Sequence, residues 1–225
     1  MSYVQPIYRN RDDVTISPAT PTKLQFQRRD RLPENQEVLW QIESGVARSI
    51  TWSQEGELVC LGYWGAGDVV GHALSRVQPY EIHCLTNVEV SRWNRNQWAQ
   101  LTDAIVHHQQ QTEELLSIIH INPISQKLWQ LLVWLSQKFG RNVDNGQTLE
   151  LPLTHQQLAQ TLGTNRVTVT TILQRLEAEG KIHRQQRRLV VARQENHARQ
   201  SKDVQSRERA NRARHRANII TSDRS

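Results

Sequence analysis

The sequence predicts an α+β fold in three parts: an N-terminal β jelly roll, a long helix, and a C-terminal helix-turn-helix domain with a β wing. Three observations predict it. Between residues 24 and 93, short segments rich in β-branched and aromatic residues recur at regular spacing, which is typical of a sandwich or jelly roll. From residue 101, a row of mostly apolar residues follows a heptad. Residues 153–182 then read as two short helices joined by a tight turn.

These features divide the chain into five parts. They are a lead (1–22), a β-roll domain (23–94), a long helix (95–121), a helix-turn-helix domain (122–192) and a tail (193–225). The lead is polar and contains Pro6, Pro18 and Pro21, which predicts a flexible segment. The tail holds many arginines and almost no apolar periodicity, so we expect it to be disordered.

The β-roll is expected to have seven strand segments, separated by turn signals such as Glu55-Gly56 and 65–68. The segments are 24–30, 37–45, 46–54, 57–65, 68–75, 80–87 and 88–93. Trp40, Trp52 and Trp64 are expected to fill the interior, since each can bury on the order of 200 Å². A ligand-stacking role for one of them is the less favoured alternative.

The long helix is expected from about Arg95 to His120, and its spacing indicates a dimer. The heptad row steps by four, three, four, three and four through Leu101, Ile105, His108, Thr112, Leu115 and Ile119. Such a row is typical of a coiled-coil seam, in which polar members can set the register. The alternative is a helix packed on its own domain.

Asn122-Pro123 ends this helix, because proline disfavours helical geometry in the residue before it. A second helix is expected over 124–139, with a buried row of Leu128, Leu131, Leu132 and Leu135 and with Trp129 and Trp134 at its margins. A loop at 141–147 and a short strand at 149–153 should lead into the helix-turn-helix.

Thr154 is a suitable N-cap for a helix through Leu162, and Gly163 can take the positive φ of a sharp turn. Ala159 is small enough for two helices to cross closely there. The next helix, from about Asn165 to Glu179, exposes a polar and basic face that includes Arg166, three threonines, Gln174 and Arg175. Threonine is a mediocre helix former, so this face predicts a recognition helix for the DNA major groove. A merely solvated face is the alternative.

Residues 181–185 and 187–192 are expected to form the wing, with Gln185-Gln186 near its turn. Lys181, His183, Arg184, Arg187 and Arg188 would meet DNA phosphates. The net charge of +6 and the pI of about 9.7 fit a polyanionic partner. The basic tail could be an arm on phosphate or a solvated extension, and neither is favoured.

Several classes of protein are excluded by absent patterns. No segment approaches the roughly 20 apolar residues of a membrane span, and the N-terminus lacks a signal-peptide core, so we expect a cytoplasmic protein without a membrane partner. The only cysteines are Cys60 and Cys84, without a CxxC pair. His72 and His83 lack the carboxylate and third histidine of a metal site. We therefore expect no metal, no cofactor and, without a catalytic constellation, no enzyme.

Over about residues 23–192, this order of parts resembles the Crp/Fnr superfamily of bacterial transcription regulators. GYWGAGDVVG at 62–71 resembles that family's turn before the phosphate-binding loop of a cyclic-nucleotide-binding-like roll. GTNRVTVTTIL at 163–173 is most similar to the recognition helix of the nitrogen-control branch. The resemblance implies a transcription regulator that binds palindromic DNA as a homodimer, with RNA polymerase as a further partner.

The resemblance also assigns residues. Arg166 stands at the place of the guanine-reading arginine. Val167 replaces a base-reading glutamate and Thr171 a second arginine, which favours a GTA-type half-site. Thr154, Asn165 and Thr168 stand at phosphate-contacting positions. The complete predicted DNA-binding set is Thr154, Gln156, Asn165, Arg166, Val167, Thr168, Thr170, Thr171, Arg175, Lys181 and Arg184.

The sensor region departs from the family pattern. His72 stands where nucleotide-binding members have a ribose-holding glutamate, and Gln78 and Pro79 stand where they have an Arg-Ser or Arg-Thr pair. A buried cyclic phosphate needs charge-assisted partners, so we expect no ordinary cyclic-AMP dependence. The candidate effector pocket comprises Gly71, His72, Arg76, Gln78 and Thr112. A regulator gated by another metabolite, such as 2-oxoglutarate, is the alternative.

Overall fold

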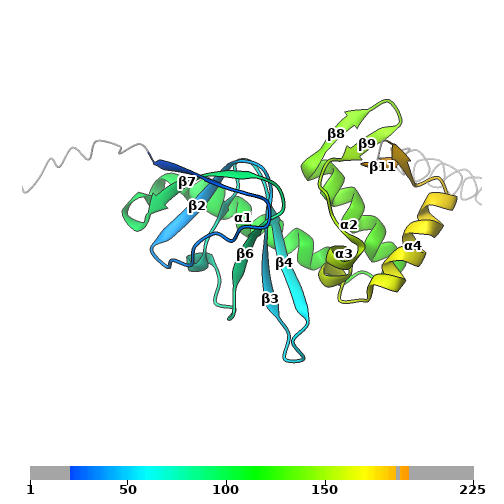
Figure 1. Ribbon diagram of the computed structural model, residues 1–225, viewed down its shortest axis with the longest axis horizontal. Helices are drawn as coiled ribbons and strands as arrows, with labels where there is room; N and C mark the ends of the chain where they lie inside the picture. Colours follow the sequence, from blue (N-terminus) through cyan, green and yellow to red (C-terminus); the bar gives the residue numbers. More distant parts are fainter. Residues whose placement is uncertain (1–20, 186–187, 193–225) are drawn as a thin grey trace, which may run out of the picture.

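The computed structural model describes residues 21–185 and 188–192. Two domains lie side by side, and a long helix reaches from the first toward the second (Figure 1). The predicted tail and nearly all of the predicted lead lie outside the described residues. Among the described residues, no helix has both the length and the apolar character needed to cross a bilayer.

The first domain is the predicted jelly roll. Its strands are β1 (Thr22–Phe26), β2 (Val38–Ser44), β3 (Ala47–Trp52), β4 (Leu58–Trp64), β5 (Val69–Val70), β6 (Glu81–Cys84) and β7 (Val88–Asn94). They pair antiparallel in two sheets, with the orders β1-β7-β2-β5 and β4-β3-β6. The segment predicted as a strand at 68–75 forms only the short β5 and a 3-10 turn at His72–Leu74.

Side chains from the two sheets fill the roll interior. Trp40 and Trp64 are 4% and 2% exposed, as predicted. Trp64 also donates its indole N–H to the hydroxyl of Ser49 at 3.0 Å, which satisfies a polar group that burial would otherwise penalise. Trp52 ends β3 and is only half-buried, because it lies at the margin of its sheet.

The predicted long helix is built in two parts. Arg95–Leu101 form a 3-10 helix (η2), and Thr102–Ile119 form α1. Leu101 packs in a cluster with Leu39 and Val69 of the roll. Leu115 is buried in a core that includes residues of the second domain. Over fewer than three heptads, repeats of 3.5 and 3.6 residues drift apart by only about 20° per heptad, so packing on the chain's own domains produces the same spacing as a coiled-coil seam.

The polar members of the heptad row are also engaged within the chain. His108 stacks on Trp64, with ring centroids 3.9 Å apart, and donates Nδ1–H to the carbonyl oxygen of Val69 at 2.9 Å. Thr112 donates its hydroxyl to the carbonyl oxygen of His108. The face of α1 that remains exposed carries Val106 and Leu116, each about half exposed. Pairing of α1 with a second copy of the chain stays a prediction. It would use the exposed face that carries Val106 and Leu116.

The second domain contains the predicted helix-turn-helix and wing. Its elements are α2 (Ile124–Phe139), β8 (Gly140–Val143), β9 (Gly146–Leu149), α3 (His155–Leu162), α4 (Arg166–Ala178), β10 (Ile182–Gln185) and β11 (Arg188–Ala192). The predicted leucine row of α2 is fully buried, and Trp129 and Trp134 pack at the margin of the core, as expected. The four strands form one antiparallel sheet in the order β10-β11-β9-β8.

The approach to the helix-turn-helix differs from its prediction. The expected loop at 141–147 is the β8–β9 hairpin, and the expected strand at 149–153 is mostly irregular because β9 ends at Leu149. Asn145-Gly146 is a strong hairpin signal that explains the turn. Gly146 has φ 151°, and a Cβ there would lie 2.1 Å from the carbonyl oxygen of Val191, so β9 can approach β11 only without a side chain at this position.

A buried polar network joins the two domains. Lys138 of α2 lies 2.8 Å from the Asp68 carboxylate of the roll and donates to the carbonyl oxygen of Tyr63 at 2.7 Å. Gln111 of α1 donates to Asp68 at 2.6 Å and also contacts Lys138. Burial lowers the pKa of Lys138, and the Asp68 charge acts against that shift. Three parts of the chain therefore meet at one ion pair.

A second set of contacts joins β3 and β4 to α3. Tyr63 hydrogen-bonds to the hydroxyl of Thr161 at 2.6 Å, and Arg48 donates to the side-chain oxygen of Gln160 at 3.0 Å. Thr161 uses its own hydrogen for the carbonyl oxygen of Gln157, so Tyr63 is the donor in their bond. The roll thus holds the C-terminal half of α3 directly.

Candidate nucleic-acid interface

The first helix of the helix-turn-helix begins at the predicted cap. The Thr154 hydroxyl accepts from the backbone N–H of Gln157 at 3.1 Å, and the Gln157 side chain accepts from the backbone N–H of Thr154 at 2.8 Å. This reciprocal pair satisfies two amides that helix geometry leaves without partners. The cap fixes the first residue of α3. Gln156, on the first turn of this helix, is exposed.

The turn between α3 and α4 also follows the sequence. Gly163 has φ 64° and ψ 44°, the left-handed conformation that glycine adopts at little cost. Ala159 and Val169 are fully buried where the helices meet. The remaining inner positions are the predicted apolar ones, all buried: Leu158, Leu162, Ile172 and Leu176.

The first residues of α4 form the most open part of this domain. Asn165 caps the helix by accepting from the backbone N–H of Thr168 at 2.8 Å. Arg166 is exposed, and its side chain makes no hydrogen bond or ion pair within the described part of the chain. Val167 is 74% exposed, the highest value among the large exposed hydrophobic residues described. A free guanidinium and a free isopropyl group therefore stand side by side at the N-terminus of the helix.

Two of the three threonines of α4 are less available as hydrogen-bond donors than the sequence suggests. Thr170 donates its hydroxyl to the carbonyl oxygen of Arg166 at 2.9 Å, and Thr171 donates to that of Val167 at 3.1 Å. A hydroxyl has one hydrogen, so neither side chain has a donor left for a base. Both oxygens can still accept. Side-chain donors at the start of α4 therefore remain on Arg166, on the amide of Asn165 and on the hydroxyl of Thr168.

The other basic residues of the predicted set have acidic neighbours. Glu179 lies 2.9 Å from Arg175 and 2.8 Å from Lys181, and hydrogen bonds from these two residues lower its pKa. Arg184, on the wing, lies 4.0 Å from Glu177. All these pairs are exposed, so each contributes little stability and opens readily. Residues 186 and 187, at the tip of the wing, lie outside the described residues.

His155 was not singled out by any sequence pattern, yet it connects the two helices. Its Nδ1 lies 2.8 Å from the Thr170 oxygen, and since Thr170 already donates elsewhere, the imidazole N–H is the donor. Partial burial lowers the pKa of His155, and the charges of Arg184 and Arg166 lower it further. A neutral ring near pH 7 follows. Its position one residue after a helix cap was the only available sign.

The five predicted effector residues are not drawn together by the contacts described. His72 is buried, donates Nε2–H to the carbonyl oxygen of Tyr80 at 3.0 Å, and has its Nδ1 without a partner. Arg76 and Gln78 are exposed on the following loop. Gly71 is buried beside β2, and Thr112 bonds within α1. No hydrogen bond or ion pair in the described chain links any of these side chains to another.

Sequence comparison finds relatives of both parts of the chain. Residues 126–196 match the model of a Crp-like helix-turn-helix domain. The regulatory protein CysR of Synechococcus elongatus is 41% identical over 180 residues, which cover 78% of this chain and 87% of that protein. The global nitrogen regulator of the same species is 32% identical over 81 residues, 36% of each chain. The nitrogen-branch likeness is thus real but shorter than the likeness to CysR.

Solved structures share the fold at low identity. A CRP-family transcriptional regulator from Thermus thermophilus superposes with a TM-score of 0.65 at 18% identity, over 76% of this chain and 92% of that one. FixK2 from Bradyrhizobium japonicum gives 0.65 at 15% identity, over 80% and 96%. The order of roll, long helix and winged helix-turn-helix is therefore common to all three chains.

Proposed function

The chain belongs to the Crp/Fnr family of transcription regulators, and on this premise we propose that it binds a palindromic DNA site as a homodimer, without ordinary dependence on cyclic AMP. One observation carries the proposal. Of the four basic residues in the predicted DNA-binding set, Arg166 alone has no acidic neighbour within the described part of the chain, and it stands exposed at the start of α4. Recognition helices present their N-terminal side chains to base edges.

The start of α4 supports a half-site with a guanine followed by a thymine. An arginine can donate two hydrogen bonds to O6 and N7 of guanine. Val167 cannot hydrogen-bond, but an exposed isopropyl group can contact the C5 methyl of thymine. Thr171 keeps only acceptor capacity, which suits the amino group of an adenine. Together these preferences read GTA.

Lys181 and Arg184 are proposed to contact phosphate, together with the N-terminus of α3. Their acidic neighbours reduce the net charge of the wing, so we expect them to position the domain more than to supply affinity. For the dimer, the exposed Val106 and Leu116 on α1 supply the apolar contact. Two-fold pairing along α1 would place two α4 helices on successive half-sites.

Independence from cyclic AMP is supported by the roll. The side chains of Arg76 and Gln78 are exposed, and His72 already uses one ring nitrogen for Tyr80. A buried phosphate without charged partners would be strongly disfavoured. Calorimetry with cyclic AMP should therefore show no low-micromolar binding. Such binding, removed by Arg76→Ala, would contradict this part of the proposal.

The central experiment compares a GTA-N8-TAC duplex with a scrambled duplex at near-physiological salt. Specific binding should exceed non-specific binding by at least about a thousandfold. Arg166→Ala should abolish that preference, whereas Arg175→Ala, a matched exposed arginine on the same helix, should weaken both duplexes alike. Equal affinity for both duplexes in the wild type would refute the proposed site. Binding that appears only with 2-oxoglutarate would instead establish the effector-gated alternative.

A further inference from the structure

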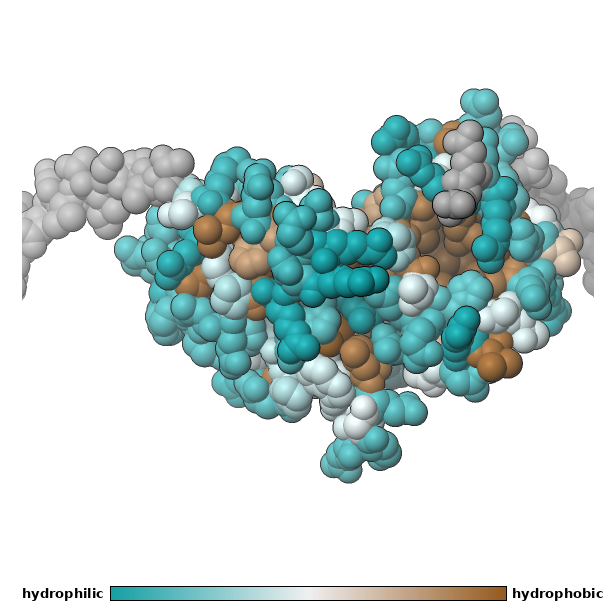
Figure 2. All heavy atoms as spheres, viewed as in Figure 1, coloured by the Kyte–Doolittle hydropathy of each residue, from teal (hydrophilic) through white to brown (hydrophobic). Residues whose placement is uncertain are grey.

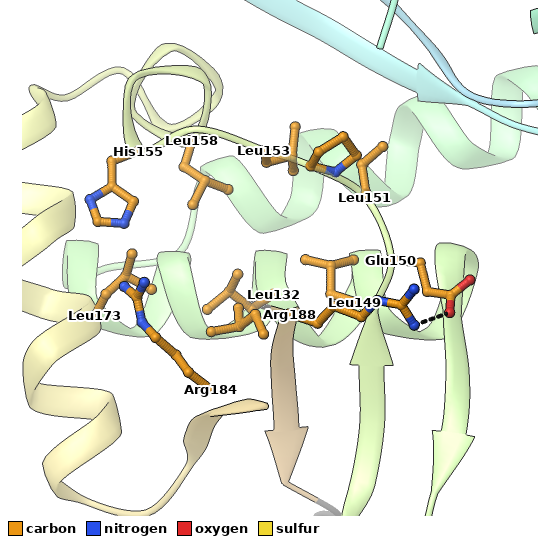
Figure 3. A pocket seen from close by; sticks show the side chains of 12 residues that line it. Leu132, Leu149, Glu150, Leu151, Leu153, His155, Leu158, Leu173, Arg184 and Arg188 are labelled. Carbon is orange, nitrogen blue, oxygen red and sulfur yellow. Dashed lines mark hydrogen bonds and ion pairs between the residues drawn. The ribbon is translucent and has the colours of Figure 1, made fainter. Parts of the chain in front are cut away.

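The DNA-binding domain contains a cavity of about 370 Å³ between α3, α4 and the β9–β11 part of the sheet (Figure 3). Its volume is within the range of small-molecule sites. Leucines form most of its wall: Leu132, Leu149, Leu151, Leu153, Leu158, Leu173 and Leu189. In the space-filling view, hydrophobic residues gather in the hollow of this domain, with hydrophilic residues around it (Figure 2).

Positive charge exceeds negative charge at the rim. Arg184 has its nearest carboxylate, that of Glu177, 4.0 Å away. Arg188 lies 3.1 Å from Glu150, but Glu150 also pairs with Arg141 at 3.2 Å. The lining thus holds two arginines and a single carboxylate, which is shared with a third arginine. An anion at the mouth, near Arg184, would complete the charge balance.

A third polar group of the lining is His155. Its Nδ1–H is used by Thr170, so the other ring nitrogen, Nε2, is an acceptor when the ring is neutral. Nε2 has no hydrogen-bond partner among the described residues. Figure 3 shows the ring and the Arg184 guanidinium at the same end of the cavity, away from the Glu150–Arg188 pair. Nε2 could therefore accept a hydrogen bond from a ligand, close to the Arg184 guanidinium that would hold the anionic group of the ligand.

We propose that this cavity binds a small amphipathic anion, with its apolar body against the leucines and a carboxylate or sulfonate at Arg184. Because Arg184 also belongs to the proposed phosphate-contacting surface, the bound anion would compete with DNA. This second step rests on the proposed function, whereas binding to the cavity does not. The site would make the DNA-binding domain, rather than the roll, a place of regulation.

The geometry connects the cavity to the base-reading residues. His155 hydrogen-bonds to Thr170, and the hydroxyl of Thr170 is bonded to the backbone of Arg166. His155 also follows Thr154, the cap of α3. A ligand against His155 and Arg184 would thus lie at one hydrogen bond from α4 and beside the N-terminus of α3. Competition between the bound anion and DNA would therefore require no long-range movement of the chain.

Direct binding is tested by titrating the full chain with 1-anilinonaphthalene-8-sulfonate and following its fluorescence. We expect saturable binding of one probe per chain, displaced by decanoate or 1-naphthoate but not by inorganic phosphate. Displacement by decanoate alone would identify a fatty-acid-like ligand, and displacement by naphthoate alone an aromatic acid. Displacement by phosphate at the same concentrations would overturn the proposal, because a simple anion site needs no apolar cavity.

Two variants locate the probe. Leu153→Trp puts a larger side chain into the cavity wall and should remove saturable binding. Arg184→Ala should weaken binding about three- to fivefold, as expected for one exposed ion pair. Arg175→Ala, which removes another exposed arginine that lies outside the lining, should leave probe binding unchanged. Wild-type affinity in both test variants would overturn the site.

The regulatory step is tested separately. With decanoate at ten times its own dissociation constant, full competition would weaken binding of the GTA-N8-TAC duplex about elevenfold. Arg184→Ala should reduce this effect, and Leu153→Trp should abolish it. Probe binding without any change in DNA affinity would overturn regulation and leave the cavity as a ligand site. Absence of specific DNA binding in every sample would count against the proposed function but not against the cavity.

Discussion

The start of α4 and the interior of the β-roll are the two places where a ligand was expected, and they treat their polar groups in opposite ways. On α4, the Arg166 guanidinium has no partner within the described chain and Val167 is open to solvent. In the roll, His72 bonds to Tyr80, and His108 of α1 bonds to Val69 of the roll while stacked on Trp64. The first region leaves these side chains open to solvent, whereas His72 and His108 in the second form hydrogen bonds within the chain.

This difference shows that residues at a sensor-like position can serve the domain junction instead. Asp68 lies in the Gly-Asp turn that resembles the family's turn before the phosphate-binding loop, and its carboxylate meets Lys138 and Gln111. In this chain, the turn therefore forms part of the junction between the two domains.

The largest effect on stability is expected at the Asp68–Lys138 ion pair between the domains. Lys138→Met should destabilise the protein by about 3–5 kcal/mol, because it leaves the Asp68 carboxylate buried without its lysine partner. Urea unfolding followed by tryptophan fluorescence measures the change. Lys23→Met, which removes an exposed partner of Glu89, is the control and should cost no more than about 1 kcal/mol. Equal losses of stability in Lys138→Met and Lys23→Met would show that the Asp68–Lys138 contact does not behave as a buried ion pair.

A smaller effect is expected at the contact between the roll and α3. Tyr63→Phe removes the donor to Thr161 and should lower the free energy of unfolding by about 1 kcal/mol. Burial raises the pKa of Tyr63, so the phenol remains a donor throughout the physiological range. In a double-mutant cycle with Thr161→Val, the two costs should not add. Strict additivity would mean that the hydrogen bond does not couple the domains.

The proposed thymine contact of Val167, at the start of α4, is tested by removing single methyl groups from the DNA. Deoxyuridine in place of the thymine of GTA in one half-site should weaken binding by about 0.8 kcal/mol, or fourfold, the value of one buried methylene-sized group. Val167→Ala should be insensitive to the same replacement. Deoxyuridine in the eight-base spacer serves as the control and should have no effect. An unchanged fourfold loss in the alanine variant would assign the methyl contact to another residue.

The smallest effect concerns pH. Burial lowers the pKa of His108 below its ordinary value of 6.5, although its bond to Val69 acts in the opposite direction. The unfolded chain therefore takes up the proton more readily, so stability is retained above about pH 6.5 and lost as pH falls toward the folded-state pKa. His108→Gln should flatten this part of the stability curve relative to the wild type. An unchanged curve in the His108→Gln variant would contradict this prediction.

Local signals in the sequence were enough to predict most of the second domain. Thr154 and Gly163 act on neighbouring backbone groups, so the cap and the turn could be placed without knowing the rest of the fold. The strands of the roll were found for the same reason, from alternation and turn residues. The hairpin of β8 and β9 was missed because its segment is polar, although Asn145-Gly146 marked the turn.

Contacts between distant residues could not be predicted in this way. Asp68 and Lys138 are 70 positions apart, and nothing in either segment indicates the other. The heptad row of α1 was visible, but spacing alone does not say which surface covers it. The hydroxyls of Thr170 and Thr171 looked free in the sequence, and only the helix geometry showed that their hydrogens are used.

The helix α3 lies between the proposed DNA surface and the roll. Its first residues adjoin the proposed phosphate contact at Thr154, and its last turns carry Gln160 and Thr161, which the roll holds. Eight helical residues span only about 12 Å and bend little. The helix α3 is therefore a short and rigid connection between these two contacts. If the roll changed the tilt of α3 at Gln160 and Thr161, the proposed DNA surface at Thr154 would turn with it.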